Sequence, residues 1–264
     1  PKPTMIAPIP VAVNAAANAL APAAAAVSLI PTATNDLDKN VLRVVYTFVI
    51  PVRKGSQRVK NKNTRKFANT HLLELKIKQL YRIFKEPIIL LSTDCHKSIK
   101  IGKNYNLKID KRPQKFTSST IPMKKVYQYL ASKVESEYVC YTNVTSPLIS
   151  DATLKKIFRI FNKKKLESLT TVHIIQEYMW YNSKALNYNP NNHPRSQNLK
   201  RIQALNFAFS IVPTAYMLLK GKIFTNKFFP YELSFPDYID VDEKKDFLIA
   251  EYLYKNKKKL IYNL

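Results

Sequence analysis

The sequence of 264 residues is poor in cysteine, with only Cys95 and Cys140. Two cysteines cannot form the disulfide framework of a small secreted domain, and alone they are too few for a structural zinc site. Cys95 precedes His96, but adjacent residues on a helix or strand do not face each other, so this pair does not indicate a nucleophile and its base. We therefore expect a reducing, cytoplasmic compartment.

Long apolar runs are also missing. The proline-free stretches of the alanine-rich N-terminal part, 11–21 and 23–30, are each too short to span a bilayer. No membrane span is expected.

Acidic residues are scarce, because 18 Asp and Glu stand against 43 Lys and Arg, which gives a formal charge of +25. A charge this large predicts an anionic partner, such as nucleic acid, an acidic membrane surface, or nucleotides and acidic sugars. A coding bias toward AT-rich codons, which the abundance of Asn, Ile and Tyr also indicates, is the alternative explanation for the excess of Lys.

Residues 1–40 differ in composition from the rest of the chain. They hold 12 Ala, six Pro and only four charged residues. The prolines interrupt any long helix, so we interpret this segment as a disordered leader or linker outside the fold. A short alanine-rich helix at 12–29 that docks on a partner is the alternative. Residues 41–264 are expected to form one domain.

From residue 41 onward, β-prone segments alternate with helix-periodic ones. The first, 44–50, is a continuous β-branched and aromatic run, as a buried parallel strand requires. Pro122 is expected in the first turn of the third helix, and Asp151 as the N-cap of the fourth. The expected strands are 44–50, 88–91, 107–110, 138–141, 169–175 and 207–212, and the expected helices are 71–84, 96–104, 121–134, 151–161 and 243–257.

This alternation predicts an α/β fold with a mostly parallel sheet and helices on both faces. Ligands bind such sheets at the carboxyl ends of the strands, which indicates the loops after residues 50, 91 and 141.

The loop after the first strand is rich in cations and holds Gly55, one of only three glycines. A scarce glycine in a basic turn indicates backbone that approaches a ligand closely. Backbone N–H groups, the Ser56 hydroxyl and several cations suit a triphosphate, although the G-K-[ST] ending of a Walker loop is missing. From composition alone, a solvated basic loop is the alternative. The loop reads Pro51-Val52-Arg53-Lys54-Gly55-Ser56-Gln57-Arg58-Val59-Lys60-Asn61-Lys62-Asn63, with five cations in the eleven residues from Arg53.

A series of short motifs follows one order along residues 43–253. They are Ile50-Pro51-Val52-Arg53-Lys54-Gly55-Ser56, Lys62-Asn63, Leu72-Leu73, Ser92-Thr93-Asp94, Arg112-Pro113, Thr145-Ser146-Pro147-Leu148, Arg195-Ser196-Gln197-Asn198-Leu199, Ile239-Asp240-Val241-Asp242 and Ala250-Glu251. In this order they resemble the sugar-nucleotide cytidylyltransferases, which activate N-acylneuraminate (sialic acid) and related nine-carbon acidic sugars, with a relative that activates the eight-carbon acid KDO. The Lys62-Asn63 form and the R-x-Q-N-L run favour the neuraminate branch.

The resemblance implies a Rossmann-like nucleotidyltransferase in which the anomeric hydroxyl of an acidic 2-keto sugar attacks the α-phosphate of CTP, so that CMP-sugar and pyrophosphate form. Such displacements depend on in-line positioning and charge neutralisation. Catalytic roles fall to Arg53, Lys62 and Asp242. Nucleotide-binding roles fall to Arg53, Gly55, Ser56, Arg58, Lys62, Asn63 and Arg112. Arg112 could equally brace its own loop.

Asp240 and Asp242 are two residues apart, which on an extended segment places both carboxylates on one side. Together with a polyanionic ligand, two carboxylates suit Mg²⁺. The resemblance favours this metal role over a charged turn that caps the helix from Glu243.

The resemblance also places sugar contacts at Asn143, Arg195, Gln197 and Asn206. Residues 176–200 are polar and irregular and resemble the arm that is exchanged between subunits in the family, so a homodimer is expected. A long surface loop is the alternative, although such loops are uncommon inside compact domains unless they are functional.

Three departures from the family pattern lie mostly on the sugar side. Gln57 replaces the usual Lys, Phe207 replaces the Gly that usually follows Asn206, and 117–123 lacks the D-T-A-S-S-like run, so that Ser118 and Ser119 would have to serve from a shorter loop. The identity of the sugar is therefore open, and a CTP-binding pseudoenzyme is one alternative.

A nucleic-acid-binding protein is the alternative of a different class. Lys124 and Lys125, interleaved with Tyr127 and Tyr129, would suit backbone contact and base stacking. The same pattern is typical of an ordinary helix with a basic solvent face, and the RRM, KH and zinc-finger signatures are missing. Nucleic acid is therefore not the expected partner.

Overall fold

The computed structural model describes residues 45–56 and 58–261. The expected leader or linker at 1–40 lies outside the described residues, and so does Gln57.

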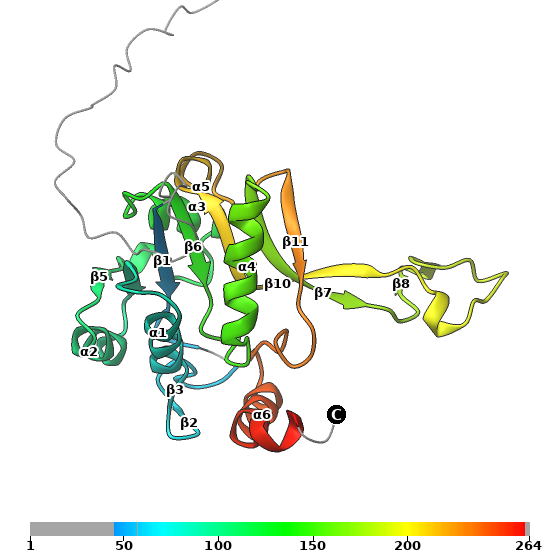
Figure 1. Ribbon diagram of the computed structural model, residues 1–264, viewed down its shortest axis with the longest axis horizontal. Helices are drawn as coiled ribbons and strands as arrows, with labels where there is room; N and C mark the ends of the chain where they lie inside the picture. Colours follow the sequence, from blue (N-terminus) through cyan, green and yellow to red (C-terminus); the bar gives the residue numbers. More distant parts are fainter. Residues whose placement is uncertain (1–44, 57, 262–264) are drawn as a thin grey trace, which may run out of the picture. The chain divides into compact units, whose positions relative to one another are not determined.

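Seven strands form one sheet in the order β11-β7-β10-β6-β1-β4-β5 (Figure 1). Every neighbouring pair is parallel except the two pairs that β10 makes, with β6 and with β7. The predicted α/β fold with a mostly parallel sheet is therefore confirmed. The strands are β1 (Tyr46–Pro51), β4 (Ile89–Thr93), β5 (Lys108–Lys111), β6 (Tyr138–Thr142), β7 (Ser168–Ile175), β10 (Ile202–Pro213) and β11 (Phe228–Glu232), and two short hairpins are formed by β2 (Lys66–Phe67) with β3 (Thr70–His71) and by β8 (Trp180–Tyr181) with β9 (Lys184–Ala185).

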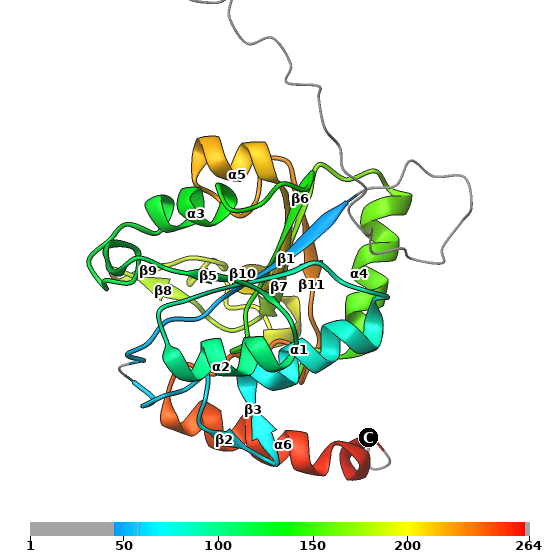
Figure 2. The ribbon, with the colours of Figure 1, turned by 90° about the vertical axis from the view of Figure 1, so that its left-hand side faces the viewer.

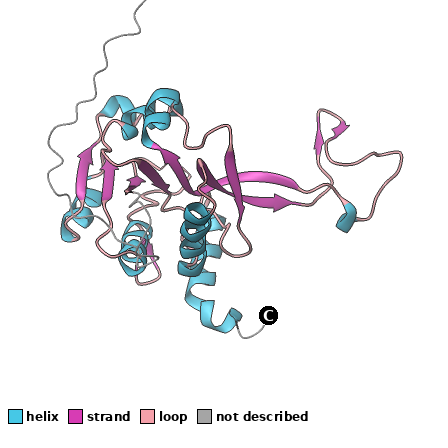
Figure 3. Cartoon of the chain, turned by 45° about the horizontal axis from the view of Figure 1, so that its top comes forward, coloured by secondary structure: helices cyan, strands magenta, loops and turns pink. Residues whose placement is uncertain are grey.

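Helices cover both faces of this sheet, as predicted (Figures 2 and 3). Alternate residues of β1 supply the two cores, because Phe48 and Ile50 belong to one apolar cluster and Val49 to the other. The first cluster takes side chains from α1 (Leu72–Ile83), α2 (His96–Asn104), α4 (Asp151–Lys163) and α6 (Lys244–Ile261), and the second from α3 (Met123–Ala131) and α5 (Thr214–Lys220).

The starts of three helices differ from the prediction in detail. Ser150, not Asp151, caps α4, because its hydroxyl accepts the N–H of Thr153 at 3.1 Å. Pro122 precedes α3 instead of lying in its first turn. At the start of α6, the carboxylate of Asp246 reaches back to accept the backbone N–H of Glu243 at 2.7 Å, as the third helical residue does in a capping box.

The segment 176–200 projects as an arm from the ends of β7 and β10 (Figure 1). The buried amide of Asn187 holds it together, because it donates to the carbonyls of Glu177 and Lys200 and accepts the N–H of Met179. The short 3₁₀ helix η2 (Ser196–Asn198) lies on this arm, and a second one, η1 (Gln114–Phe116), follows β5. The arm is an ordered part of the chain, and its exchange between two subunits stays a prediction.

Candidate active site

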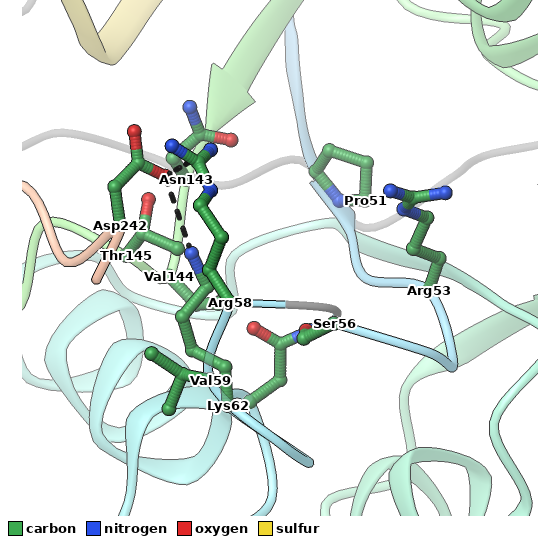
Figure 4. A pocket seen from close by; sticks show the side chains of 11 residues that line it. Pro51, Arg53, Ser56, Arg58, Val59, Lys62, Asn143, Val144, Thr145 and Asp242 are labelled. Atoms are coloured by element: carbon green, nitrogen blue, oxygen red, sulfur yellow. Dashed lines mark hydrogen bonds and ion pairs between the residues drawn. The ribbon is translucent and has the colours of Figure 1, made fainter. Parts of the chain in front are cut away.

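A polar cavity of about 370 Å³ opens at the carboxyl ends of β1 and β6 (Figure 4). Two of the three loops expected to bind a ligand line it, those after β1 and β6. The cavity is lined by Pro51, Arg53, Ser56, Arg58, Val59, Lys62, Asn63, Asn143, Val144, Thr145 and Asp242. The structure thus brings together seven residues predicted to belong to a site: Arg53, Ser56, Arg58, Lys62, Asn63, Asn143 and Asp242.

The basic loop after β1 is fixed at two points beside Gly55. Gly55 has a φ of +83°, and the space where a Cβ atom would lie is open, so the conformation favours glycine and packing does not. The N–H of Lys54 donates to Asp94 Oδ1 at 2.6 Å, and Arg53 Nη1 donates to the carbonyl of Thr117 at 3.0 Å. The loop after β4 therefore takes part through Asp94, which holds the basic turn in place.

Asp242 forms ion pairs with two cations that line the cavity (Figure 4). Its Oδ1 lies 3.1 Å from Arg58 Nη2 and 3.4 Å from Lys62 Nζ. Lys62 Nζ also donates to the carbonyl of Val241 at 2.5 Å. The expected alternative, that Asp242 caps α6, is not what the structure shows, because Asp246 reaches the start of that helix.

Asp240 lies deeper than Asp242. Its Oδ1 accepts the Ser146 hydroxyl at 3.2 Å, and burial raises the pKa of its carboxyl, with a further contribution from the nearby charge of Asp242. Among the described residues, no group of three or more His, Cys, Asp or Glu is arranged to hold a metal. Two carboxylates with Mg²⁺ would therefore need oxygens from a ligand and from water, which is the donor set that this ion takes beside phosphates.

A second cavity, of about 530 Å³, shares Asp242 with the first. It contains the predicted residues Asn206, Asp240 and Asp242, so the two carboxylates predicted to hold Mg²⁺ line one cavity. Most of its other walls are apolar or aromatic. The lining consists of His173, Leu205, Asn206, Phe207, Phe235, Tyr238, Ile239, Asp240, Asp242, Asp246 and Ile249.

Two polar atoms in the wall of the second cavity are buried without a hydrogen-bond partner among the described residues. They are Nδ1 of His173 and Nδ2 of Asn206. The His173 ring stacks on Tyr238 at 5.2 Å between centroids, and Asn206 Oδ1 accepts the hydroxyl of Thr171 at 2.7 Å. Buried polar groups are nearly always paired, so these two atoms are exceptions within the described chain. His173 and Tyr238 were not predicted.

Phe207, which stands where the family usually has glycine, has a φ of +53°. This left-handed conformation is the one that glycine adopts freely, and β10 is irregular in its pairing with β7 at this point. The Phe207 carbonyl accepts Asn143 Nδ2 at 2.9 Å, which ties a wall of the second cavity to a residue of the first.

Three predicted residues lie away from both cavities. Arg112 is buried and donates to the hydroxyl and the carbonyl of Ser92, which is the bracing role left open for it. Arg195 and Gln197 are exposed on the arm. Contacts of Arg112 with nucleotide, and of Arg195 and Gln197 with sugar, stay predictions.

Ser118 and Ser119 do not line either cavity. Both are exposed, and only their neighbour Thr117 touches the basic loop, through the carbonyl that accepts Arg53.

The two tyrosines that a nucleic-acid-binding protein would use for base stacking are engaged within the fold. Tyr129 stacks on Phe116 at 4.1 Å between centroids and donates its hydroxyl to Asp110, and Tyr127 packs edge-on against Tyr141. In the described part of the chain, no helix is both long and apolar enough to cross a membrane.

Comparison with known proteins agrees with this geometry. A cytidylyltransferase family model matches residues 47–258. A post-translational flagellin modification protein B of Campylobacter coli is 25% identical over 223 residues, which cover 79% of this chain and 94% of that protein. A pseudaminic acid cytidylyltransferase of Campylobacter jejuni is 26% identical over 225 residues, which cover 78% and 95% of the two chains.

Two solved structures share the fold at low sequence identity. A CMP:2-keto-3-deoxy-manno-octonic acid synthetase complexed with CTP superposes with a TM-score of 0.57 at 12% identity, covering 80% of this chain and 99% of that one. A 4-diphosphocytidyl-2C-methyl-D-erythritol synthase of Anaerococcus prevotii gives a TM-score of 0.56, also at 12% identity, with the same two coverages. Because the family model spans most of the chain and the cation-lined cavity lies where an α/β sheet binds its ligand, this protein belongs to the cytidylyltransferase family.

Proposed function

We propose that the protein transfers the CMP group of CTP to an acidic 2-keto sugar of the sialic-acid type and releases pyrophosphate. The observation that carries the proposal is the pair of cavities that meet at Asp242, one lined with cations and one with mostly apolar walls. A nucleotidyl transfer needs two such compartments, because the nucleotide and the acceptor must meet at the phosphorus atom.

The first cavity suits the triphosphate of CTP. Arg58 and Lys62 lie on one side of it and Arg53 on another (Figure 4), so negative charge can be met from two directions. An arginine can grip two phosphate oxygens at once, whereas a lysine supplies a point charge. Without nucleotide, Asp242 is the counterion of Arg58 and Lys62, and the arriving triphosphate would replace it in that role.

Asp240 and Asp242 are the residues that would hold Mg²⁺, and the ion would neutralise charge that develops on the triphosphate. The hydroxyls of Thr145 and Ser146 hydrogen-bond to the Asp240 carboxylate and hold it in place, and its remaining lone pairs would serve the ion. Asp242 is half-exposed at the edge of both cavities, so its carboxylate can turn toward a nucleotide-bound ion.

The second cavity suits the acceptor. Its lining includes the polar side chains of His173 and Asn206, while Leu205, Phe207 and Ile249 offer apolar contact to groups such as the methyl of an N-acyl substituent. A relative that is 26% identical is a pseudaminic acid cytidylyltransferase, which supports a sialic-acid-like acceptor as the first candidate to test.

The decisive experiment measures pyrophosphate release with Mg²⁺, each of the four nucleoside triphosphates, and a panel of pseudaminic acid, N-acetylneuraminate and KDO. We expect release with CTP and one of the two nine-carbon acids, and little with ATP, GTP or UTP. Equal release from all four nucleotides, or none with any acceptor, would refute the proposal.

We also propose that two copies associate through the arm. Arg195 and Gln197 lie on the arm and outside the cavities that hold Asn206, so one chain does not gather all the residues expected to contact the sugar. The arm also exposes Trp180 and Tyr181.

If the arm completes the site of a second copy, mixing inactive Arg195→Ala and Asp242→Asn proteins should restore up to about a quarter of the wild-type rate. A monomer by analytical ultracentrifugation, or a mixture as inactive as its parts, would contradict this proposal.

A further inference from the structure

Lys76 is a buried lysine that the chemistry above does not use. Its side chain on α1 is 1% exposed, and Lys76 and Arg112 are the only charged residues in the buried set of the described chain. Lysines are almost never fully buried unless they are paired, so this position calls for a physical reason.

The ammonium of Lys76 and the amide of Gln79 together hold one loop. Lys76 Nζ donates to Gln79 Oε1 at 2.8 Å and to the carbonyl of Ser146 at 3.3 Å. Gln79 Nε2 donates to the carbonyl of Ile149 at 2.7 Å. The two side chains are three residues apart on one face of α1, so they bind both ends of the turn 146–149, which leads from β6 toward α4.

That turn carries hydrogen bonds to the segment of Asp240. The Ser146 hydroxyl donates to Asp240 Oδ1 at 3.2 Å, and the carbonyl of Thr145 accepts the N–H of Val241 at 2.7 Å. Thr145 itself lines the first cavity. Any shift of the turn would therefore move Asp240 relative to the bound nucleotide.

Stability does not explain a lysine at this place. Burial lowers the pKa of Lys76 to about 7, opposed by the charges of Asp151 and Asp237 and reinforced by Arg82. An apolar side chain of similar length would avoid this desolvation but would leave the Ser146 carbonyl and Gln79 Oε1 without their donor.

We propose that Lys76, assisted by Gln79, is a positioning residue that holds the turn at Ser146 so that Asp240 faces the metal ion. The inference rests on the proposed function, because it assigns a support to the proposed metal ligand. Residues that orient a metal ligand from behind typically change metal affinity or activity by roughly 10- to 100-fold when they are removed.

The test compares Lys76→Met with Lys78→Met, which removes the same charge from the same helix at a side chain that is 52% exposed. Mn²⁺ replaces Mg²⁺, and electron paramagnetic resonance measures the free Mn²⁺. Each sample contains the protein and CTP but no acceptor, and the blank contains CTP without protein. We expect Mn²⁺ affinity to fall about tenfold or more in Lys76→Met and to stay at the wild-type value in Lys78→Met. Lys76→Gln, which keeps a donor for the Ser146 carbonyl, should recover most of the affinity.

A purely structural role predicts a different result, in which Lys76→Met unfolds more easily while the folded fraction binds Mn²⁺ normally. The stability of the two proteins should also differ in its dependence on pH. Burial of the Lys76 charge lowers the free energy of unfolding by its full amount below pH 7, where Lys76 is protonated in both the folded and the unfolded protein. This loss of stability declines as pH rises from about 7 toward 10.5. In urea unfolding, the stability of the wild type relative to Lys76→Met should therefore be lowest below pH 7 and rise at higher pH.

Two outcomes separate this inference from the function on which it rests. If the wild-type protein binds no more Mn²⁺ than CTP does alone, the proposed metal site and the inference are both refuted. If the wild type binds Mn²⁺ and Lys76→Met binds it equally well, only the role of Lys76 is refuted.

Discussion

Asp242→Asn is the substitution that most directly tests the proposed chemistry. The change keeps the size of the side chain and removes one negative charge. In the structure that charge meets Arg58 at 3.1 Å and Lys62 at 3.4 Å, and the Asp242 side chain is 49% exposed.

The expected effects on stability and on rate differ widely. Ion pairs of a half-exposed carboxylate are worth about 0–1 kcal/mol each, so losing both should lower the free energy of unfolding by about 2 kcal/mol at most. Loss of a metal carboxylate removes transition-state stabilisation of about 3–4 kcal/mol, which corresponds to a rate decrease of roughly 10²- to 10³-fold. The affinity of Asp242→Asn for CTP without metal should instead rise. Arg58 and Lys62 lose a competing counterion, so they can bind the triphosphate more freely.

The assay is kcat/KM for CTP across a magnesium titration, beside urea unfolding and CTP binding in EDTA. Glu243→Gln is the matched control, because it removes the same charge one residue along the chain, where the carboxylate is exposed and pairs with Lys245. We expect this control to keep the wild-type rate. Wild-type kinetics in Asp242→Asn, or equal losses in both variants, would refute the metal role of Asp242.

Three further predictions follow from local contacts. Ser150→Ala removes the cap of α4 and should cost about 0.5–2 kcal/mol in urea unfolding without changing the rate. Hydrogen bonding from Tyr105 lowers the pKa of Glu74 to about 2, so the contribution of Glu74 to the free energy of unfolding is present above about pH 4.5 and lost as pH falls toward 2. Glu74→Gln should therefore be less stable than wild type by about 2 kcal/mol at pH 6. The difference should vanish near pH 2. Phe207→Gly relieves left-handed strain of about 1–2 kcal/mol but loses the stacking on Phe224, so thermal unfolding should change little while KM for the acceptor, and not for CTP, rises.

The strands and helices that the sequence predicts are those with strong local patterns. The run at 44–50 is continuously β-branched and aromatic and the helix near 71–84 has an apolar stripe, and β1 and α1 lie there. Two elements had no such signal. Strand β11 contains Pro230 and pairs only with β7 at the edge of the sheet, and proline lowers strand propensity. Helix α5 has seven residues, too few to establish a helical period.

The direction and length of β10 could not be predicted for a different reason. Its residues 202–213 alternate well enough for a strand, but whether a strand runs parallel or antiparallel depends on its partners and not on its own sequence. Phe207 added to the difficulty, because the pairing with β7 is irregular there and only the second half of the strand, 207–212, is apolar throughout except for Ser210.

The two halves of the site differ in the same way. Most of the first cavity comes from one loop, Pro51 to Asn63, so its cations are visible together in the sequence. The second cavity draws His173, Leu205, Tyr238 and Ile249 from segments far apart along the chain, and each one reads as ordinary core on its own. Substitutions among such scattered walls can change the preferred sugar and leave every short motif intact. A motif resemblance can therefore identify the nucleotide chemistry of this protein, whereas the choice of acceptor depends on the side chains that only the fold brings together.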